Sequence, residues 1–324
     1  MTLNVGILAM MRGAMASRDG TLAIAREAER LGFSHIGIND HVVVPRDISS
    51  KYPYSDHGQW AGKAFGECME LLTTMAFIAG ATETIRILSS VMILPYRPPV
   101  LTAKMIATAD VLSGGRMIVG CGVGWMLEEF EALSAPAFKD RGAASDEFLA
   151  AFNELWTAEE PSMRGNFVHF SGIAFEPKPL QRSRPPIWIG GESRIALKRT
   201  VQFGDGWYPA SNNPQRRLDT PGRLRTDIEI LHRLCEEMKR EPATVDVGLA
   251  ILWPVSWVAE AGTDGSRKML TGSSDQLASD LDALERAGVR NLSLLFQTAT
   301  VNETIDRMQR FSQEVLVHRK PAKA

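Results

Sequence analysis

The stretch RMIVGCGVGWMLEEF (Arg116–Phe130) passes from an apolar run through alternating glycines into a polar segment. Its first part, Met117–Val119, is typical of a buried strand. Gly120, Gly122 and Gly124 permit a tight turn with positive φ, and they also let a flat ligand approach bare backbone. The stretch alone leaves both a strand-end turn and a ligand-binding wall open, so its place in the chain has to decide.

The glycine spacing differs from the dinucleotide-binding fingerprint. Its third glycine comes one residue too early, and the stretch falls in the fourth strand–helix unit instead of the first. A Rossmann-type nucleotide site is therefore disfavoured.

Strand-like runs alternate with helical segments along the whole chain. The eight runs are Leu3–Ala9, Ser34–Asn39, Ile85–Leu94, Arg116–Cys121, Pro186–Gly190, Gly206–Ala210, Val245–Leu252 and Asn291–Phe296. This alternation predicts a parallel sheet, and the count predicts its closure into a (β/α)₈ barrel that forms one domain over residues 1–324. A doubly wound sheet is the alternative, but no single crossover divides the chain into two halves.

Local signals mark where several helices begin. Asp19 is predicted to cap the first helix, and Thr220-Pro221 places proline at a first helical position. Ser273 and Gln276 form a capping-box pattern at a later helix start.

Three intervals are longer than a minimal barrel needs: Pro45–Gly66 after strand 2, Glu159–Arg184 before strand 5 and Trp253–Gly272 after strand 7. The first and third follow strand ends. They therefore fall on the face of a barrel where loops form the binding pocket.

The second and third helices, predicted over Glu67–Ala81 and Val100–Leu112, are apolar almost all round. A helix without a polar face is buried on both sides. One side meets the barrel, and we expect the other to meet a second copy of the chain in a homodimer.

Composition is that of an ordinary globular protein, with 44% apolar and 23% charged residues and a net charge of −2. No block of like charges indicates nucleic acid or a membrane surface, and no apolar run reaches the ~20 residues that span a bilayer. Cys68, Cys121 and Cys235 are scattered, which disfavours disulfides and a thiolate metal site. The start of the chain lacks the features of a secretory leader, so we expect a cytoplasmic protein.

Asn39-Asp40-His41 ends the second strand, at the face where barrels hold their active sites. A histidine there can act as acid or base near neutral pH, or donate a hydrogen bond to a cofactor. The alternative is a strand-end turn in which Asp40 accepts from backbone amides.

Gly190-Gly191-Glu192-Ser193 follows the fifth strand and precedes a helix. Free amides and the positive end of the helix dipole make such a loop a ready phosphate site. An ordinary capped loop is the alternative, and Glu192 is a small argument against an anion. The chain lacks a G-x-S-x-G elbow, a Walker loop, H-E-x-x-H and clustered Cys/His ligands, so acyl-transfer, nucleotide-hydrolysis and metal chemistry have no support.

In this order, the motifs resemble the luciferase-like monooxygenase superfamily of flavin and deazaflavin enzymes, up to about Ala210. The most specific pieces are NDH (39–41), SGGR (113–116), GVGW (122–125) with EEF (128–130), PPIWIGG (185–191) and GDGW (204–207). Together they resemble the branch of probable oxidoreductases that use coenzyme F420, a 5-deazaflavin.

The resemblance implies a barrel whose strand ends carry the cofactor ring. Asn39, Asp40 and His41 would lie at the ring, with His41 near the carbon that transfers the hydride. Ser90-Val91 matches a bulge with a non-proline cis peptide behind the ring. The other implied cofactor contacts are Gly122, Gly124, Gly190, Gly191, Glu192 and Ser193.

We therefore expect an oxidoreductase that passes a hydride between F420 and an organic substrate, with His41 as proton donor or electrostatic partner. The predicted substrate wall is Tyr52, Trp60, Tyr96 and Trp125. Sugar-phosphate dehydrogenases of this branch carry an acid at the position of Trp125, so their substrate is not carried over. The alternatives are an FMN-dependent monooxygenase that uses reduced flavin and O₂, and a catalytically silent barrel that carries or senses a ligand.

Overall fold

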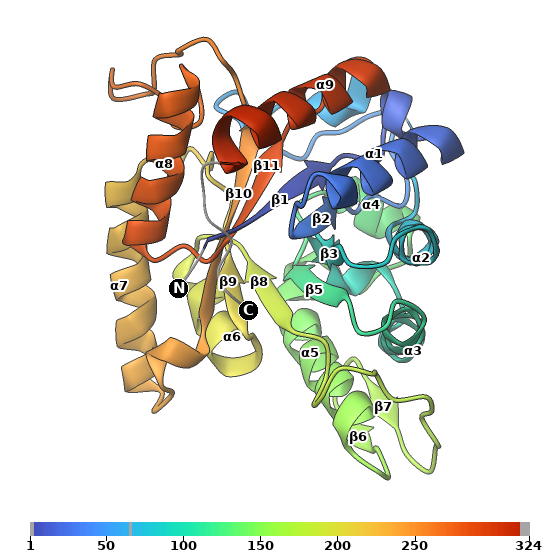
Figure 1. The fold of residues 1–324 in the computed structure, drawn as a ribbon. Helices are drawn as coiled ribbons and strands as arrows, with labels where there is room; N and C mark the ends of the chain where they lie inside the picture. The colour runs from blue at the N-terminus through green and yellow to red at the C-terminus, as the bar shows by residue number, and fades with distance from the viewer. Residues whose placement is uncertain (1–2, 65–66, 318–324) are drawn as a thin grey trace.

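The computed structural model describes residues 3–64 and 67–317, so the last two residues of the predicted insertion Pro45–Gly66 lie outside the described residues. The chain forms a closed barrel of parallel strands surrounded by helices (Figure 1). In spatial order the barrel strands are β1 (Asn4–Ala9), β2 (His35–Ile38), β3 (Arg86–Ser89) with its continuation β4 (Met92–Ile93), β5 (Met117–Gly122), β8 (Ile187–Gly190), β9 (Gly206–Tyr208), β10 (Asp246–Pro254) and β11 (Asn291–Leu295). Pairing of β11 with β1 closes the barrel. The predicted (β/α)₈ barrel is confirmed.

Helices follow the strands around the outside of the barrel (Figure 1). They are α1 (Arg18–Arg30), α2 (Leu71–Ala81), α3 (Pro99–Leu112), α4 (Leu127–Ala132), α5 (Arg141–Thr157), α6 (Arg194–Phe203), α7 (Pro221–Glu237), α8 (Ser274–Ala287) and α9 (Val301–Phe311). The predicted insertion before the fifth barrel strand contains a short hairpin, β6 (Met163–Arg164) with β7 (His169–Phe170), which extends away from the barrel.

Two of the three helix-start predictions are confirmed. Thr220 caps α7, and Ser273 forms a complete capping box with Gln276 at α8. The prediction for Asp19 is wrong, because the hydroxyl of Ser17 accepts from the Gly20 amide and α1 begins at Arg18, two residues before the start that a cap at Asp19 implies. Asp19 instead lies in the first turn, where a negative charge favours the helix dipole.

The second helix begins later than predicted. Its first residue is Leu71, and the carboxylate of Glu70 caps it by accepting from the Thr73 amide. Glutamate is a rare cap, so Glu70 gave no sign of a helix start. The predicted helix therefore wrongly included the residues from Glu67 to Glu70.

A bulge interrupts the third barrel strand, and the peptide bond between Ser90 and Val91 is cis. Glycines on neighbouring strands make room for it. A Cβ on Gly37 would lie 3.1 Å from Ser90 Cβ, and one on Gly122 would lie 2.7 Å from Val91 Cγ2. A Cβ on Gly190 would lie 3.2 Å from Val91 Cγ1. Gly122 therefore serves packing beside the bulge, a role different from the cofactor contact that the resemblance implied.

A chain of hydrogen bonds runs through the barrel interior from this bulge. The Tyr208 hydroxyl lies 3.1 Å from Ser90 Oγ and donates to Ser293 Oγ at 2.7 Å. Ser293 Oγ in turn lies 2.7 Å from Nε2 of His35. Burial lowers the pKa of His35 to about 3, with the charge of Arg86 as a second cause. His35 is therefore a neutral core residue with satisfied hydrogen bonds.

His35 makes the stability of the protein depend on pH. Below about pH 6.5 the unfolded chain binds a proton at His35 that the folded protein does not, so the free energy of unfolding falls by about 1.4 kcal/mol per pH unit. Between about pH 6.5 and 5 the loss is about 2 kcal/mol. In urea denaturation, the free energy of unfolding should therefore fall over this pH range by about 2 kcal/mol more in the wild type than in His35→Gln. The exposed His169 is the control, because His169→Gln should keep the wild-type slope.

The outer sides of α2 and α3 are open to solvent in the single chain. Leu101 is 55% exposed and Leu112 is 71% exposed. The expectation that both helices are buried on two sides is thus not met within one chain, and the homodimer stays a prediction. No helix in the described part of the chain combines the length and apolar character that a bilayer crossing requires.

Candidate active site

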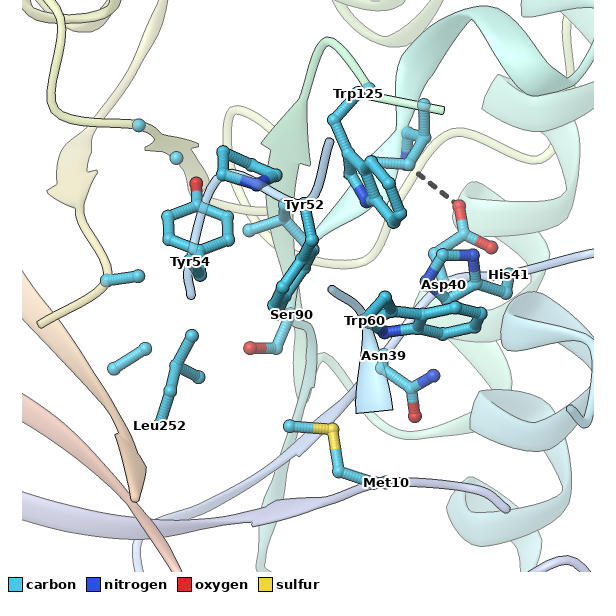
Figure 2. Close-up of a pocket in the computed structure, with 18 of the residues that line it drawn as sticks. Met10, Asn39, Asp40, His41, Tyr52, Tyr54, Trp60, Ser90, Trp125 and Leu252 are labelled. Atoms are coloured by element: carbon cyan, nitrogen blue, oxygen red, sulfur yellow. Dashed lines mark hydrogen bonds between the residues drawn. The ribbon is translucent and has the colours of Figure 1, made fainter. Parts of the chain in front are cut away.

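A cavity of about 220 Å³ opens at the carboxyl ends of the barrel strands (Figure 2). Its lining comes from the strand ends and from the loop after β2: Met10, Arg12, Asn39, Asp40, His41, Tyr52, Pro53, Tyr54, Trp60, Ser90, Val91, Ile93, Gly124, Trp125, Gly190, Gly191, Tyr208, Ala210, Ala250 and Leu252. Strand-end side chains of a barrel converge on one space, which is why residues far apart in sequence meet here.

His41 is held from behind by a buried carboxylate. Its Nδ1 lies 2.8 Å from Oε2 of Glu129, which also accepts from the Tyr96 hydroxyl at 2.9 Å. The other oxygen of Glu129 accepts from the Val42 and Val43 amides at 2.7 and 3.2 Å. Among the described residues, no hydrogen bond reaches His41 Nε2, so this nitrogen is the one available to a ligand.

Asp40 lies at the cavity, but its carboxylate is engaged within the protein. Arg97 donates to both of its oxygens at 2.8 Å, and the Ile93 amide donates to one of them at 2.8 Å. Burial lowers the pKa of Arg97, but its bonds and charge interactions with Asp40 and Glu70 raise that pKa overall. Asp40 therefore anchors the strand end through Arg97 and the Ile93 amide while it also lines the cavity, whereas His41 keeps Nε2 open to a ligand.

Asn39 also makes a hydrogen bond that holds the strand end in place. Its Oδ1 accepts from the Met11 amide at 2.8 Å, which ties the end of β2 to the segment after β1.

Aromatic rings form one side of the cavity (Figure 2). The Trp60 ring lies 4.3 Å from the His41 ring, and Trp125 lies 5.1 Å from Tyr52 between ring centroids. Burial raises the pKa of Tyr52 to about 12, so its hydroxyl stays neutral. Tyr96 does not line the cavity, contrary to expectation, because it is buried behind His41 with its hydroxyl on Glu129.

The predicted phosphate loop is divided between two roles. Gly190 and Gly191 present backbone to the cavity, whereas the Ser193 hydroxyl caps α6 by accepting from the Ala196 amide. Glu192 points into the protein, where its carboxylate accepts from the Ala210 amide at 2.8 Å. Burial raises the pKa of Glu192. Its side chain therefore serves the fold, and the cofactor contact that the resemblance implied stays a prediction.

Several lining residues were missed from the sequence. Met10 and Arg12 directly follow β1, and Tyr208 ends β9. The strand-end rule that located His41 would also have located these three. Arg12 brings a guanidinium to the cavity, 5.8 Å from the centroid of the Trp60 ring.

The loop after β2 is fastened to the barrel at two places. Near its start, the Glu128 carboxylate accepts from the Ser49 and Ser50 amides at 2.6 and 3.0 Å. Further along, Asn212 donates to the Tyr54 carbonyl at 2.8 Å. These contacts hold the segment that carries Tyr52 against the barrel mouth.

Residues 3–311 match the family model described as luciferase-like monooxygenase. The chain belongs to the luciferase-like monooxygenase family. This confirms the resemblance that the order of the motifs indicated.

One curated relative is an FMNH₂-dependent enzyme. The chain is 35% identical to the FMNH₂-dependent dimethylsulfone monooxygenase of Pseudomonas putida over 197 residues, 60% of this chain and 49% of that protein. The chain thus spans about half the length of this curated relative.

Solved structures of other enzymes share the fold. The F420-dependent tetrahydromethanopterin reductase of Methanopyrus kandleri matches 99% of this chain and 100% of its own, with a TM-score of 0.73 and 16% identity. The long-chain alkane monooxygenase LadA matches 100% of this chain and 94% of its own, with a TM-score of 0.76 and 11% identity. At these identities the likeness shows the fold alone. The comparisons therefore leave both F420 and FMN open as the cofactor.

The cavity suits a flat ring system. The Ser90-Val91 bulge and the bare backbone of Gly190 and Gly191 lie on one part of its surface, and the aromatic rings lie on another. In the described part of the chain, no three His, Cys, Asp or Glu side chains gather as a metal site requires.

Proposed function

We propose that this luciferase-like protein is an oxidoreductase that transfers a hydride between coenzyme F420 and an organic substrate. One observation carries the proposal: His41, the Ser90-Val91 bulge and the backbone of Gly190 and Gly191 surround one largely apolar cavity. When bound, a deazaflavin supplies hydride chemistry, because carbon stands where a flavin has its reactive nitrogen.

The residues of the chain have separate tasks in this proposal. The backbone at Val91, Gly190 and Gly191 would hold the ring, while Trp60 and Trp125 would orient the substrate and exclude water. Holding the two reactants about 3–3.5 Å apart supplies much of the rate enhancement. His41 would hold or deliver a proton at Nε2.

The second candidate function is that of an FMN-dependent monooxygenase, and the 35% identity to the Pseudomonas putida enzyme favours it. The same cavity would serve, with reduced FMN supplying oxygen chemistry.

Titration of the purified protein with F420 and, separately, with FMN tests the proposal through the fluorescence of each ligand. We expect tighter binding of F420, together with anaerobic hydride exchange between F420 and a panel of alcohols, ketones and enones. Tight binding of FMN alone would reject F420 in favour of the second candidate. Binding without turnover across the panel would instead indicate a carrier or sensor.

We also propose that the chain is a single cytoplasmic domain. The free cysteines Cys68, Cys121 and Cys235 are consistent with a reducing compartment.

We propose a homodimer through α2 and α3, because these helices expose large apolar side chains. Leu112→Asp places a charge in that face and should convert a dimer into a monomer in sedimentation at micromolar concentration. Ile195 on α6 is 68% exposed, so Ile195→Asp is the matched control and should leave the dimer intact. A wild-type protein that sediments as a monomer would contradict the proposal.

A further inference from the structure

Glu129 is a carboxylate surrounded by hydrogen-bond donors and withdrawn from solvent. Its side chain has 0% exposure, against 11% for the side chain of His41. Two backbone amides, from Val42 and Val43, occupy Oε1, while Tyr96 Oη and His41 Nδ1 occupy Oε2. A backbone N–H can only donate, so Oε1 must be an acceptor.

Tyr96 adds a second constraint on Oε2. Burial raises the pKa of the Tyr96 phenol, and the charge of Glu129 raises it further. The phenol therefore keeps its proton and donates a hydrogen bond to Oε2. Three donors are already directed at the two oxygens of this carboxylate, which makes it an acceptor group, so the remaining partner, His41 Nδ1, is placed to donate as well.

We propose that Glu129 is a positioning residue that keeps the proton of neutral His41 on Nδ1 and thereby leaves Nε2 bare toward the cavity. Which nitrogen of a histidine carries the proton is set by the hydrogen bond that the other nitrogen makes. A bare Nε2 accepts a proton or a hydrogen bond from a ligand, whereas a protonated Nε2 in a neutral ring could only donate. Glu129 thus decides which of these tasks the neutral ring performs.

A purely structural role for Glu129 is the competing explanation, since its bonds to Val42 and Val43 fasten the segment after β2. Glu129→Gln separates the two roles. The amides of Val42 and Val43 require an acceptor, so they hold the glutamine oxygen at the Oε1 position. The glutamine NH₂ group then faces His41 Nδ1 and donates to it, and the proton of His41 must move to Nε2. The substitution keeps the shape and the backbone anchor but reverses the tautomer.

Nitrogen-15 NMR of histidine-labelled protein measures the tautomer directly. At about pH 8.5, well above the ordinary histidine pKa of roughly 6.5, rings of ordinary basicity are neutral and each nitrogen reports whether it carries a proton. The chain has six histidines, and the signals missing from His41→Asn identify those of His41. We expect Nδ1–H in the wild type and Nε2–H in Glu129→Gln. Tyr96→Phe is the control, because it removes one donor, leaves the carboxylate and should keep Nδ1–H.

An Nε2–H signal in the wild type, or an unchanged signal in Glu129→Gln, would overturn the inference. The wild-type spectrum decides even if Glu129→Gln fails to fold.

The catalytic consequence rests on the proposed function. We expect Glu129→Gln to lower the rate of hydride transfer by about 10²–10⁴-fold while cofactor affinity is retained, as for other enzymes whose histidine is forced into the wrong tautomer. The NMR measurement needs neither cofactor nor substrate, so it can succeed where the proposed reaction fails. A switched tautomer with unchanged hydride transfer would remove Glu129 from the mechanism.

Discussion

Replacing Arg97 by methionine is expected to lower the free energy of unfolding by about 3–5 kcal/mol. Arg97 donates to both oxygens of Asp40 at 2.8 Å, and the two side chains are only 11% and 0% exposed. Methionine keeps much of the stem of Arg97 but leaves the Asp40 carboxylate buried without its counter-charge. The Ile93 amide is then its remaining hydrogen-bond donor among the described residues.

Urea denaturation of three variants measures this effect. Combining Asp40→Asn with Arg97→Met should recover part of the loss, because asparagine still accepts from the Ile93 amide and carries no charge. Arg18→Met is the control for an exposed pair. Arg18 and Asp19 are 75% and 88% exposed, so that substitution should cost less than about 1 kcal/mol. If Arg97→Met and Arg18→Met lowered the free energy of unfolding equally, burial would not strengthen the Arg97–Asp40 pair.

The barrel could be predicted because its signals are local. Each strand is a short apolar run between turn residues, and side chains such as Thr220 and Ser273 bond to amides within their own helix. The errors occur where two local signals compete. Ser17 and Asp19 are both good caps, and only the backbone conformation at Ser17 selects between them.

The candidate site could be predicted only to the extent that it follows strand ends. Its hydrogen-bonded side-chain pairs join residues far apart in sequence: 57 positions separate Asp40 from Arg97, and 88 separate His41 from Glu129. A single sequence does not show which distant charges meet. For this reason the bonds from Arg97 to Asp40 could not be predicted, and the expected contact between Asp40 and a cofactor stays a prediction.

Tyr96 shows the same limit for an aromatic residue. The proline-rich turn that carries Tyr96 directs its ring inward. There the ring centroid lies 5.1 Å from that of Phe130, and the hydroxyl donates to Glu129. Loop position alone suggested a place on the cavity wall, and only the three-dimensional path of the turn excludes it.

His41→Asn is expected to lower the rate of hydride transfer by about 10²–10⁴-fold while the protein stays folded. The asparagine amide nitrogen is bonded to Cγ, as is the imidazole Nδ1, so it can still donate to Glu129 Oε2. The atom that is lost is Nε2, the nitrogen that makes no hydrogen bond within the described residues. The substitution therefore removes the proposed contact to the reactants and spares the anchor behind it.

Three measurements on His41→Asn separate chemistry from binding and folding. Single-turnover hydride transfer should fall, whereas the affinity for F420 and the urea midpoint should stay near those of the wild type. The exposed His169 on β7 supplies the matched control, since His169→Asn should leave all three unchanged. Retained hydride transfer in His41→Asn would show that the proton is handled elsewhere. The hydroxyl of Tyr52 would then be the next group to replace, because it is held neutral by a pKa raised to about 12 and also lines the cavity.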